Sequence, residues 1–371
     1  MIKIMHVLTD TNLGGAGMWL LNFLRAYDRE KYDVSVALPE GAVLAERVRA
    51  LGVTVYEVKD IADLSYSKKG TGELKKLLRN VRPDIVHCHA SLSARIAAKK
   101  LGIPVVNTRH CIEEPKKFPK NIIYSIANNA LSDIIIGVSE KTCENLVECG
   151  TKKSKVRLVY NGVFPLRELD ADEKEKVREK YSIPRGNAVV GIVARLEPVK
   201  NPAFLLDTAK FVLDDEPNVT FLVVGGGSLW DELHEKADRL GIGENVIFTG
   251  TLDDTSDAVN VMDVVTLTSD KEALSLSLIE GMTLGKPAVS TDSGGPSEVL
   301  DGGCGTITPI GDARAFADAV LGFIRDTDAA KRAGNAGRKR AREVFGIDAM
   351  ISSLDKIYGE ISGKGTEDEN N

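Results

Sequence analysis

Glu272 and Glu280 stand with seven residues between them, across the start of an expected helix. Carboxylates accept paired hydrogen bonds from vicinal hydroxyl groups, such as those of a sugar or a ribose. The apolar neighbours Leu276, Leu278 and Ile279 argue against a solvated helix face, because they indicate a buried approach. The two carboxylates could therefore reach different parts of one hydroxyl-rich ligand.

Two cationic side chains, Arg195 and Lys200, follow an expected strand at 189–193. A diphosphate carries about two negative charges, which two fixed cations and a helix N-terminus would neutralise. Surface solvation is the ordinary role of any Lys or Arg. The position at the end of a strand favours a ligand-binding role for this pair.

Two glycine-rich turns also follow expected strands. They contain Gly14, Gly15 and Gly17 in the first half of the chain, and Gly225, Gly226 and Gly227 in the second. Glycines let backbone approach a ligand closely, and a helix N-terminus favours an anion. Neither turn is the dinucleotide fingerprint, because Leu20 and Trp230 stand where its last glycine belongs. Tight strand-to-helix packing would explain these glycines equally well.

His87 and His89 end an expected strand, and His110 ends the next one. Such a pattern with nearby cysteines could indicate zinc. Strand alternation, however, puts His87 and His89 on the opposite face from Cys88, and no fourth ligand has convincing spacing. We therefore predict no metal and interpret these histidines as polar groups lining a cleft.

The elements that must position these residues are alternating strands and helices. Apolar, β-branched runs are separated by amphipathic segments, which indicates parallel sheets covered on both faces. The expected strands are 2–8, 34–38, 54–58, 85–89, 105–108, 134–138 and 156–159, then 189–193, 219–224, 246–249, 264–266 and 288–290. The sequence thus predicts an α/β fold of two Rossmann-like, doubly wound domains. Ligands bind at the carboxyl ends of such strands, so two facing domains would surround one cleft.

A polar, charge-dense stretch at 166–187 separates the two runs and is interpreted as a linker with one short helix. The predicted divisions are an N-terminal domain at 1–165, a C-terminal domain at 187–344, a final helix at 345–363 and a disordered acidic tail at 364–371. The chain from 313 to about 361 is expected to be helical.

Composition describes a globular protein of 371 residues with 43% hydrophobic side chains. No secretory signal or membrane-spanning stretch is present, and five cysteines without a CxxC motif indicate reduced thiols. These features favour a cytoplasmic protein.

The charge is unevenly distributed along the chain. Residues 1–165 contain 25 basic and 17 acidic side chains, whereas residues 166–371 contain 23 and 37. The basic half could contact anionic lipid or a phosphate-bearing acceptor, although a solvated face is equally consistent. No aromatic-interleaved basic stripe accompanies the charge, so we expect no nucleic-acid partner.

Taken together, the motifs resemble those of glycosyltransferase family 4, whose members adopt the GT-B fold. The resemblance covers nearly the whole chain and depends on the order of the motifs. They are the Gly14-Gly15 turn, residues 84–89, His110, residues 161–163, Arg195-Leu196 with Lys200, Gly225 to Gly227, residues 248–250, the Glu272 and Glu280 pair, and residues 294–298.

The resemblance implies roles for individual residues. Arg195 and Lys200 would hold the leaving diphosphate, and Glu280 would bind ribose hydroxyls. Glu272 and His110 would face the transferred sugar. Further donor contacts are expected from Gly14, Gly15, Gly225, Gly227, Thr249, Leu252 and Leu276, and acceptor-side contacts from His87, His89 and Gly17. Gly17 departs from the charged or larger residue that the family often has there, which loosens its assignment. The final helix would pack back on the first domain.

The implied activity is transfer of a hexose-type sugar from a nucleoside-diphosphate sugar to an acceptor hydroxyl, with retention of anomeric configuration. UDP is favoured over GDP, and neither a metal nor a cofactor is required. The acceptor would be a carbohydrate or lipid-linked intermediate of cell-surface polysaccharide or glycolipid biosynthesis, at the inner face of the membrane. Two alternatives are a non-hydrolysing sugar-nucleotide epimerase and a catalytically silent protein that binds nucleotide sugars.

Overall fold

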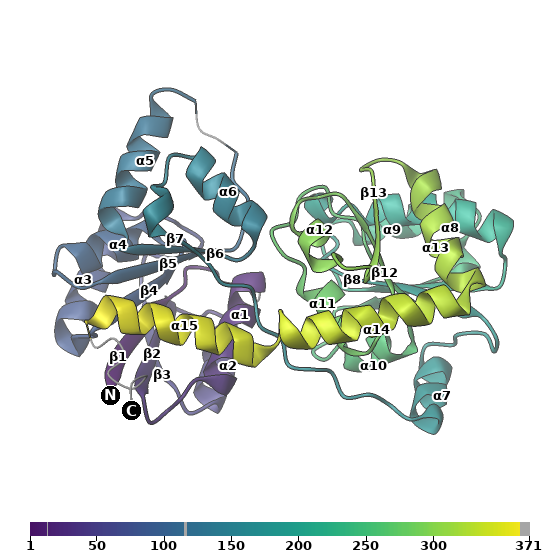
Figure 1. Ribbon diagram of the computed structural model, residues 1–371, viewed down its shortest axis with the longest axis horizontal. Helices are drawn as coiled ribbons and strands as arrows, with labels where there is room; N and C mark the ends of the chain where they lie inside the picture. Colours follow the sequence, from purple (N-terminus) through teal and green to yellow (C-terminus); the bar gives the residue numbers. More distant parts are fainter. Residues whose placement is uncertain (13, 115–116, 364–371) are drawn as a thin grey trace. The chain divides into compact units, whose positions relative to one another are not determined.

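The computed structural model describes residues 1–12, 14–114 and 117–363, which form two compact units (Figure 1). Unit 1 contains Met1–Gly162 and continues from Ile347, and unit 2 is Val163–Gly346. The acidic tail expected at 364–371 lies outside the described residues. Among the helices that are described, none is both long and apolar enough to cross a membrane.

Unit 1 is built on a seven-stranded parallel sheet in the order β3-β2-β1-β4-β5-β6-β7. Its strands are β1 (Ile2–Val7), β2 (Tyr32–Pro39), β3 (Thr54–Val58), β4 (Ile85–His89), β5 (Val105–Arg109), β6 (Ile134–Gly137) and β7 (Val156–Leu158). Its helices are α1 (Gly15–Ala26), α2 (Leu44–Ala50), α3 (Lys68–Val81), α4 (Leu92–Lys99), α5 (Lys120–Leu131), α6 (Glu140–Glu148) and α15 (Ile347–Ser362), with a 3-10 turn at Lys153–Lys155.

The central strands of this sheet supply two cores, one on each face. Along β1, Ile4 packs in the core covered by α1, α2 and α15, whereas Met5 and Val7 pack in the core covered by α3 and α4. Successive side chains of a strand point to opposite faces, so a strand buried on both faces must be apolar almost throughout. Figure 1 shows α15 (yellow) beside α1, and its Tyr358 is fully buried in the first core.

Unit 2 is built on a six-stranded parallel sheet in the order β10-β9-β8-β11-β12-β13. Its strands are β8 (Ala188–Val193), β9 (Val219–Val224), β10 (Val246–Gly250), β11 (Val264–Leu267), β12 (Ala288–Thr291) and β13 (Gly305–Thr308). Its helices are α7 (Ala171–Lys180), α8 (Pro202–Asp215), α9 (Trp230–Arg239), α10 (Ser256–Val261), α11 (Leu276–Thr283), α12 (Gly295–Val299), α13 (Ala313–Arg325) and α14 (Thr327–Glu343), with 3-10 turns at Pro198–Lys200 and Gly243–Asn245.

The segment expected to be a linker at 166–187 is instead an integral part of unit 2. Asn260 of α10 holds it: its side chain accepts a hydrogen bond from the Leu169 N–H (2.9 Å) and donates one to the Arg167 carbonyl (3.0 Å). A capping box between Asp170 and Glu173 then starts α7. The chain passes between the units at 162–163 and again at 346–347.

Both sheets contain a topological switch point. There the chain, having added strands on one side of the first strand, returns to add the next strand on its other side. It falls between β1 and β4 in unit 1 and between β8 and β11 in unit 2. Doubly wound folds bind ligands outside the carboxyl ends of the strands at this point. These two edges are therefore where the candidate residues should gather.

Candidate functional site

Lys200 and Glu272 meet at the switch point of unit 2. Lys200 ends the turn that follows β8, and Glu272 lies in the loop that follows β11. The Lys200 Nζ donates a hydrogen bond to Glu272 Oε2, and the Ser269 hydroxyl donates to the same oxygen at 3.3 Å. Both side chains are largely buried, with 22% and 12% of their surfaces exposed. The two charges therefore hold each other in a fixed geometry.

The backbone of Glu272 is fixed by the neighbouring loop after β12. Its N–H donates to the Ser293 carbonyl, and its own carbonyl accepts from the Gly295 N–H, each at 2.9 Å. A Cβ on Gly295 would lie 1.9 Å from the Ala273 carbonyl oxygen, so only glycine permits this approach. The Gly294-Gly295 motif therefore positions Glu272.

The glycine turn after β9 grips the loop that presents Arg195. The Leu196 N–H donates to the Gly226 carbonyl at 2.9 Å. A Cβ on Gly225 would lie 1.9 Å from the Ala194 carbonyl oxygen, and one on Gly227 would lie 2.4 Å from the Leu196 carbonyl oxygen. These glycines are thus explained by close packing against the Arg195 loop, and direct contact with a donor stays a prediction.

The Arg195 side chain itself is exposed, and no described residue forms a hydrogen bond or ion pair with its guanidinium. It thus differs from Lys200, whose charge is already met by Glu272. Arg195 therefore offers its positive charge to an anionic ligand at the switch point.

Glu280 lies on α11 and is partly buried, and no described residue donates a hydrogen bond to its carboxylate. Burial first, and then the negative charge of Asp254, raise the pKa of Glu280 to about 7. Asp254 and Leu252 lie in the loop that follows β10, the strand that contains Thr249, so the structure brings this loop near Glu280. A buried carboxylate without donors is suited to accept hydrogen bonds from ligand hydroxyls.

Two other donor-site candidates lie on the surrounding backbone. Leu276 is the first residue of α11, and the Thr249 hydroxyl donates to the Gly250 carbonyl at 2.9 Å. That carbonyl also accepts from the Gly225 N–H at 3.0 Å, which ties the β10 loop to the glycine turn. Sequence reasoning missed Ser269 and Asp254, whose roles depend on contacts between separate loops.

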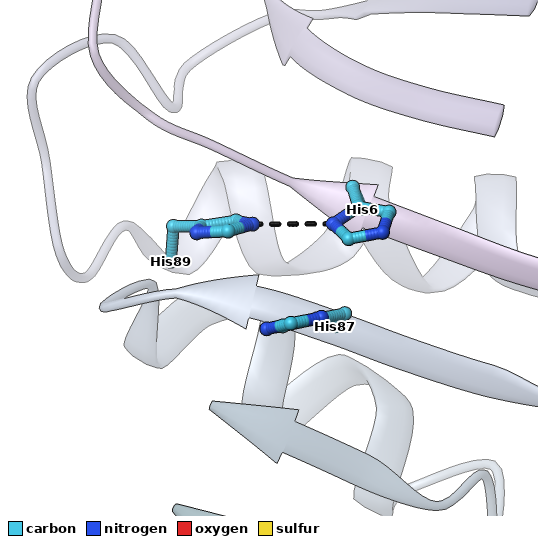
Figure 2. A group of neighbouring side chains, drawn as sticks. All are labelled: His6, His87 and His89. Carbon is cyan, nitrogen blue, oxygen red and sulfur yellow. Dashed lines mark hydrogen bonds between the residues drawn. The ribbon is translucent and has the colours of Figure 1, made fainter. Parts of the chain in front are cut away.

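At the switch point of unit 1, four histidines gather. His6 on β1 pairs in register with His87 on β4, and its Nδ1 lies 3.2 Å from His89 Nε2 (Figure 2). The His89 Nδ1 lies 2.8 Å from His110 Nε2, so His6, His89 and His110 form one hydrogen-bonded chain. His6 is not among the residues that the sequence motifs single out, and only the pairing of its strand with β4 places it beside His87.

His87 is anchored separately from this chain. Its Nδ1 lies 2.7 Å from the Tyr358 hydroxyl of α15, and its Nε2 lies 2.7 Å from the Thr108 hydroxyl. Both ring nitrogens thus have protein partners, which gives His87 a structural role. The expectation that His87 contacts an acceptor stays a prediction.

Two pairs of rings in this cluster are close to parallel. His87 and His89 are within 11° of parallel, and His6 and His89 are within 23°. Figure 2 shows His87 and His89 as nearly parallel rings seen edge-on. Ring nitrogens of His6, His87 and His89 lie within 4.8 Å of one another, and the absence of a metal stays a prediction.

Burial keeps the histidine rings neutral. It lowers the pKa of His6 and of His110 to about 3, and it holds the pKa of His87 and His89 well below the usual 6.5. A neutral imidazole has one N–H, so the hydrogen bonds that join His6, His89 and His110 can all be donated toward His110 or all away from it. The His110 Nδ1 at its end has no hydrogen-bond partner in the described structure, and could donate to or accept from a ligand.

The first glycine turn leaves open space beside this cluster. Gly14 is the N-cap of α1 without a side-chain cap, and a Cβ on Gly14 or Gly15 would meet nothing within 4 Å. Gly17 is buried within α1, two residues before Trp19, whose ring centroid lies 4.9 Å from that of His89. The uncapped N–H groups at the start of α1 are available to an anion.

Comparison with known proteins gives matches over both units. Residues 13–165 match the family described as Glycosyltransferase Family 4, and residues 173–340 match the family described as Glycosyl transferases group 1. A putative glycosyltransferase, EpsD, of Bacillus subtilis is 26% identical over 80% of this chain and 82% of its own length. The UDP-Gal:alpha-D-GlcNAc-diphosphoundecaprenol alpha-1,3-galactosyltransferase of Escherichia coli is 27% identical over 96% of both chains.

Solved structures show the same fold. Anabaena HepE in complex with UDP and glucose superposes with a TM-score of 0.86 at 22% identity, covering 97% of this chain and all of that one. WaaG, a glycosyltransferase involved in lipopolysaccharide biosynthesis, superposes with a TM-score of 0.74 at 15% identity, with the same coverage.

Proposed function

Because the chain belongs to glycosyltransferase family 4 and has the GT-B fold, we propose that it transfers a hexose-type sugar from a UDP-sugar, with retention, to an acceptor hydroxyl. The observation that carries this proposal is the set of groups at the switch point of unit 2. Among the described residues, none forms a hydrogen bond or ion pair with the side chain of Arg195 or of Glu280, and these two groups accompany the fixed Lys200 and Glu272 pair. These are the charges that a nucleoside diphosphate with its ribose requires.

The chemistry proposed for these residues is stabilisation of the leaving group. Negative charge develops on the diphosphate as the bond to the sugar breaks, and fixed cations lower the energy of that state. Arg195 and Lys200 would supply this charge without a metal. Glu280 would accept the ribose hydroxyls, while Glu272 and the Nδ1 of His110 would face the sugar.

Neither glutamate is suited to be a covalent nucleophile of the glycosidase type. Glu272 is held by Lys200, and Glu280 is assigned to the ribose. We therefore propose that the acceptor hydroxyl attacks from the face of the departing diphosphate, whose oxygen accepts the proton. The sugar then keeps its anomeric configuration.

Names of relatives support the choice of substrates. The E. coli relative is named for UDP-Gal and a diphosphoundecaprenol-linked acceptor, and the HepE structure is described with UDP and glucose. We propose a UDP-sugar donor and a carbohydrate or lipid-linked acceptor for this chain, in polysaccharide or glycolipid biosynthesis. The basic charge of residues 1–165 supports peripheral contact with an anionic membrane.

A panel of nucleotide sugars tests this function without knowledge of the acceptor. We expect slow release of UDP from one UDP-sugar, because water replaces the acceptor at low rate. Formation of an epimer from the donor, without an acceptor, would instead indicate an epimerase. If no nucleotide sugar is turned over and none raises the melting temperature, the proposal is wrong.

A further inference from the structure

Unit 1 contains a pocket of about 400 Å³ between α4, α5 and the end of β5. Its polar lining includes Arg95 of α4 and Arg109, which immediately precedes His110. Its apolar lining includes Leu92, Ile123 and Ala127. None of the roles described above uses this pocket.

Arg95 is buried with an unmet charge. Only 3% of its surface is exposed, yet no described residue forms an ion pair with it. Its Nη1 donates to the neutral Asn128 side chain at 2.8 Å, and its Nε has no hydrogen-bond partner in the described structure. Burial first, and then the positive charge of nearby Arg109, lower the pKa of Arg95 to about 10. A buried charge without a counter-ion destabilises the ligand-free fold, and binding of an anion would offset that cost.

The nearby carboxylate of Glu113 does not neutralise Arg95, because it is paired with the neighbouring Arg109. The Arg109 Nη2 pairs with Glu113 Oε1 at 2.7 Å, and its side chain is 6% exposed. Two guanidinium groups thus share one carboxylate, which leaves one positive charge in the pocket. An acidic group with several acceptor oxygens could bond to the free Nε of Arg95 and restore the balance.

The surface beside the pocket is apolar. Ile123 lines the pocket and is 65% exposed, and Ile122 and Ile126 on α5, with Phe118 just before it, are also exposed. Phe118, Ile122 and Ile126 are spaced four residues apart. Exposed apolar side chains gathered on one element are a feature of binding surfaces. Of these side chains, Ile123 lines the pocket beside Arg95, whereas Ile122 and Ile126 line a second hollow on α5.

We propose that this pocket binds an anionic amphiphile, with its acidic group on Arg95 and Arg109 and its hydrocarbon chain along α5. Thr108 bonds to His87 on one face of the sheet, so Arg109, the next residue of β5, points to the opposite face. Binding of the amphiphile is therefore independent of the proposed function.

Calorimetry on the full chain, with dodecyl phosphate below its micelle-forming concentration, tests the proposal. We expect dodecyl phosphate to bind at least about tenfold more tightly than inorganic phosphate or the neutral dodecyl maltoside. Equal binding of inorganic phosphate would reduce the pocket to a simple anion site, and equal binding of the maltoside would reduce it to an apolar surface. Either result overturns the proposal.

Variants separate the pocket from the fold. Arg95→Met should weaken dodecyl phosphate binding about tenfold or more and yet raise the melting temperature, because it removes an unpaired buried charge. Glu113→Gln should tighten binding, because it removes the competing carboxylate. The matched control is Arg79→Met, at an exposed arginine of α3 in the same unit, which should change neither quantity.

Unchanged binding by Arg95→Met, or a lower melting temperature together with unchanged binding by Glu113→Gln, would contradict the assignment. UDP release from the donor is measured separately in the absence of any amphiphile. Failure of the pocket proposal therefore leaves the transfer proposal standing, and the reverse also holds.

Discussion

The Lys200 ammonium donates its hydrogen bond to Glu272, so the cation assigned to the diphosphate and the carboxylate assigned to the sugar are bound to each other. They come from loops after β8 and β11, the strands that flank the switch point of unit 2. The pair fixes two long side chains before any substrate arrives. Preorganised charges of this kind cost little reorganisation when the leaving group departs.

This pairing predicts strong coupling between the two residues. Lys200→Met and Glu272→Gln should each destabilise unit 2, since each leaves a partly buried group without its partner, whereas the double variant should lose less than the sum. Urea unfolding of the four proteins should give a coupling energy of about 1–3 kcal/mol.

The exposed pair Lys210 and Asp214 on α8 provides the control for that cycle. Its coupling should be below about 0.5 kcal/mol, as for other solvent-exposed pairs one helical turn apart. Additive effects of the Lys200 and Glu272 substitutions would show that the observed contact carries no energy.

Glu280 predicts a pH dependence of donor binding. Its pKa of about 7 means that ionisation is incomplete at neutral pH, and only the carboxylate accepts both ribose hydroxyls. UDP-glucose has no group of its own that titrates in this range, so its affinity should rise between pH 6 and 8. Glu280→Gln should weaken binding and flatten the curve, whereas Glu244→Gln, at an exposed site, should leave it unchanged. A wild-type curve matching that of Glu280→Gln would remove the ribose assignment.

The same group predicts a stability change of opposite sense. The folded protein holds a proton on Glu280 that the unfolded chain releases near pH 4.5. The contribution of Glu280 to the free energy of unfolding should therefore fall as pH rises from 4.5 to about 7 and then level off. Comparison of wild type with Glu280→Gln across this range measures it.

The buried histidines predict a different pH profile for unit 1. Their pKa values are lowered by burial, so the unfolded chain binds protons below pH 6.5 that the folded protein excludes until about pH 3 for His6 and His110. Their stabilising effect is present above pH 6.5 and is lost as the pH falls toward 3. Nitrogen-15 NMR should show neutral rings for His6, His89 and His110 at pH 5.

The chain through His89 adds a spectroscopic test. His89→Phe removes the partner of His110 Nε2, so the tautomer signals of His110 should change. Substitution of His234, which lies on α9 in unit 2, should leave those signals as they are. Charged imidazoles at pH 6, or His110 signals that are the same in His89→Phe as in the wild type, would contradict this row of hydrogen-bonded histidines.

The alternation of apolar runs was sufficient to predict the seven strands of unit 1 and five of the six in unit 2. It failed at β13, a four-residue strand at the sheet edge that begins at Gly305 and has little apolar content. It also failed to divide the helical stretch after residue 313. In the structure, α13 ends and α14 begins at Asp326. The side chain of Asp326 accepts from the N–H groups of Asp328 and Ala329 and so caps the new helix.

The sequence was sufficient to predict those site residues that come directly after a strand. Arg195, Lys200 and Glu272 all follow strand ends, and parallel pairing brings those ends together. Contacts made across strands were not predictable in this way. The pairing of Lys200 with Glu272, and the place of His6 beside His87, depend on register and strand order, which a single sequence does not specify.

Turnover by Arg195→Ala tests the central claim most directly, because this cation has no described protein partner and is assigned to the leaving diphosphate alone. UDP release and donor affinity are measured with the UDP-sugar found in the panel, with Arg185→Ala, at an exposed residue of unit 2, as control. The account predicts that Arg195→Ala raises the barrier to UDP release by about 2–4 kcal/mol with a smaller loss of donor affinity, and that the control retains full activity. Full turnover by Arg195→Ala would contradict it.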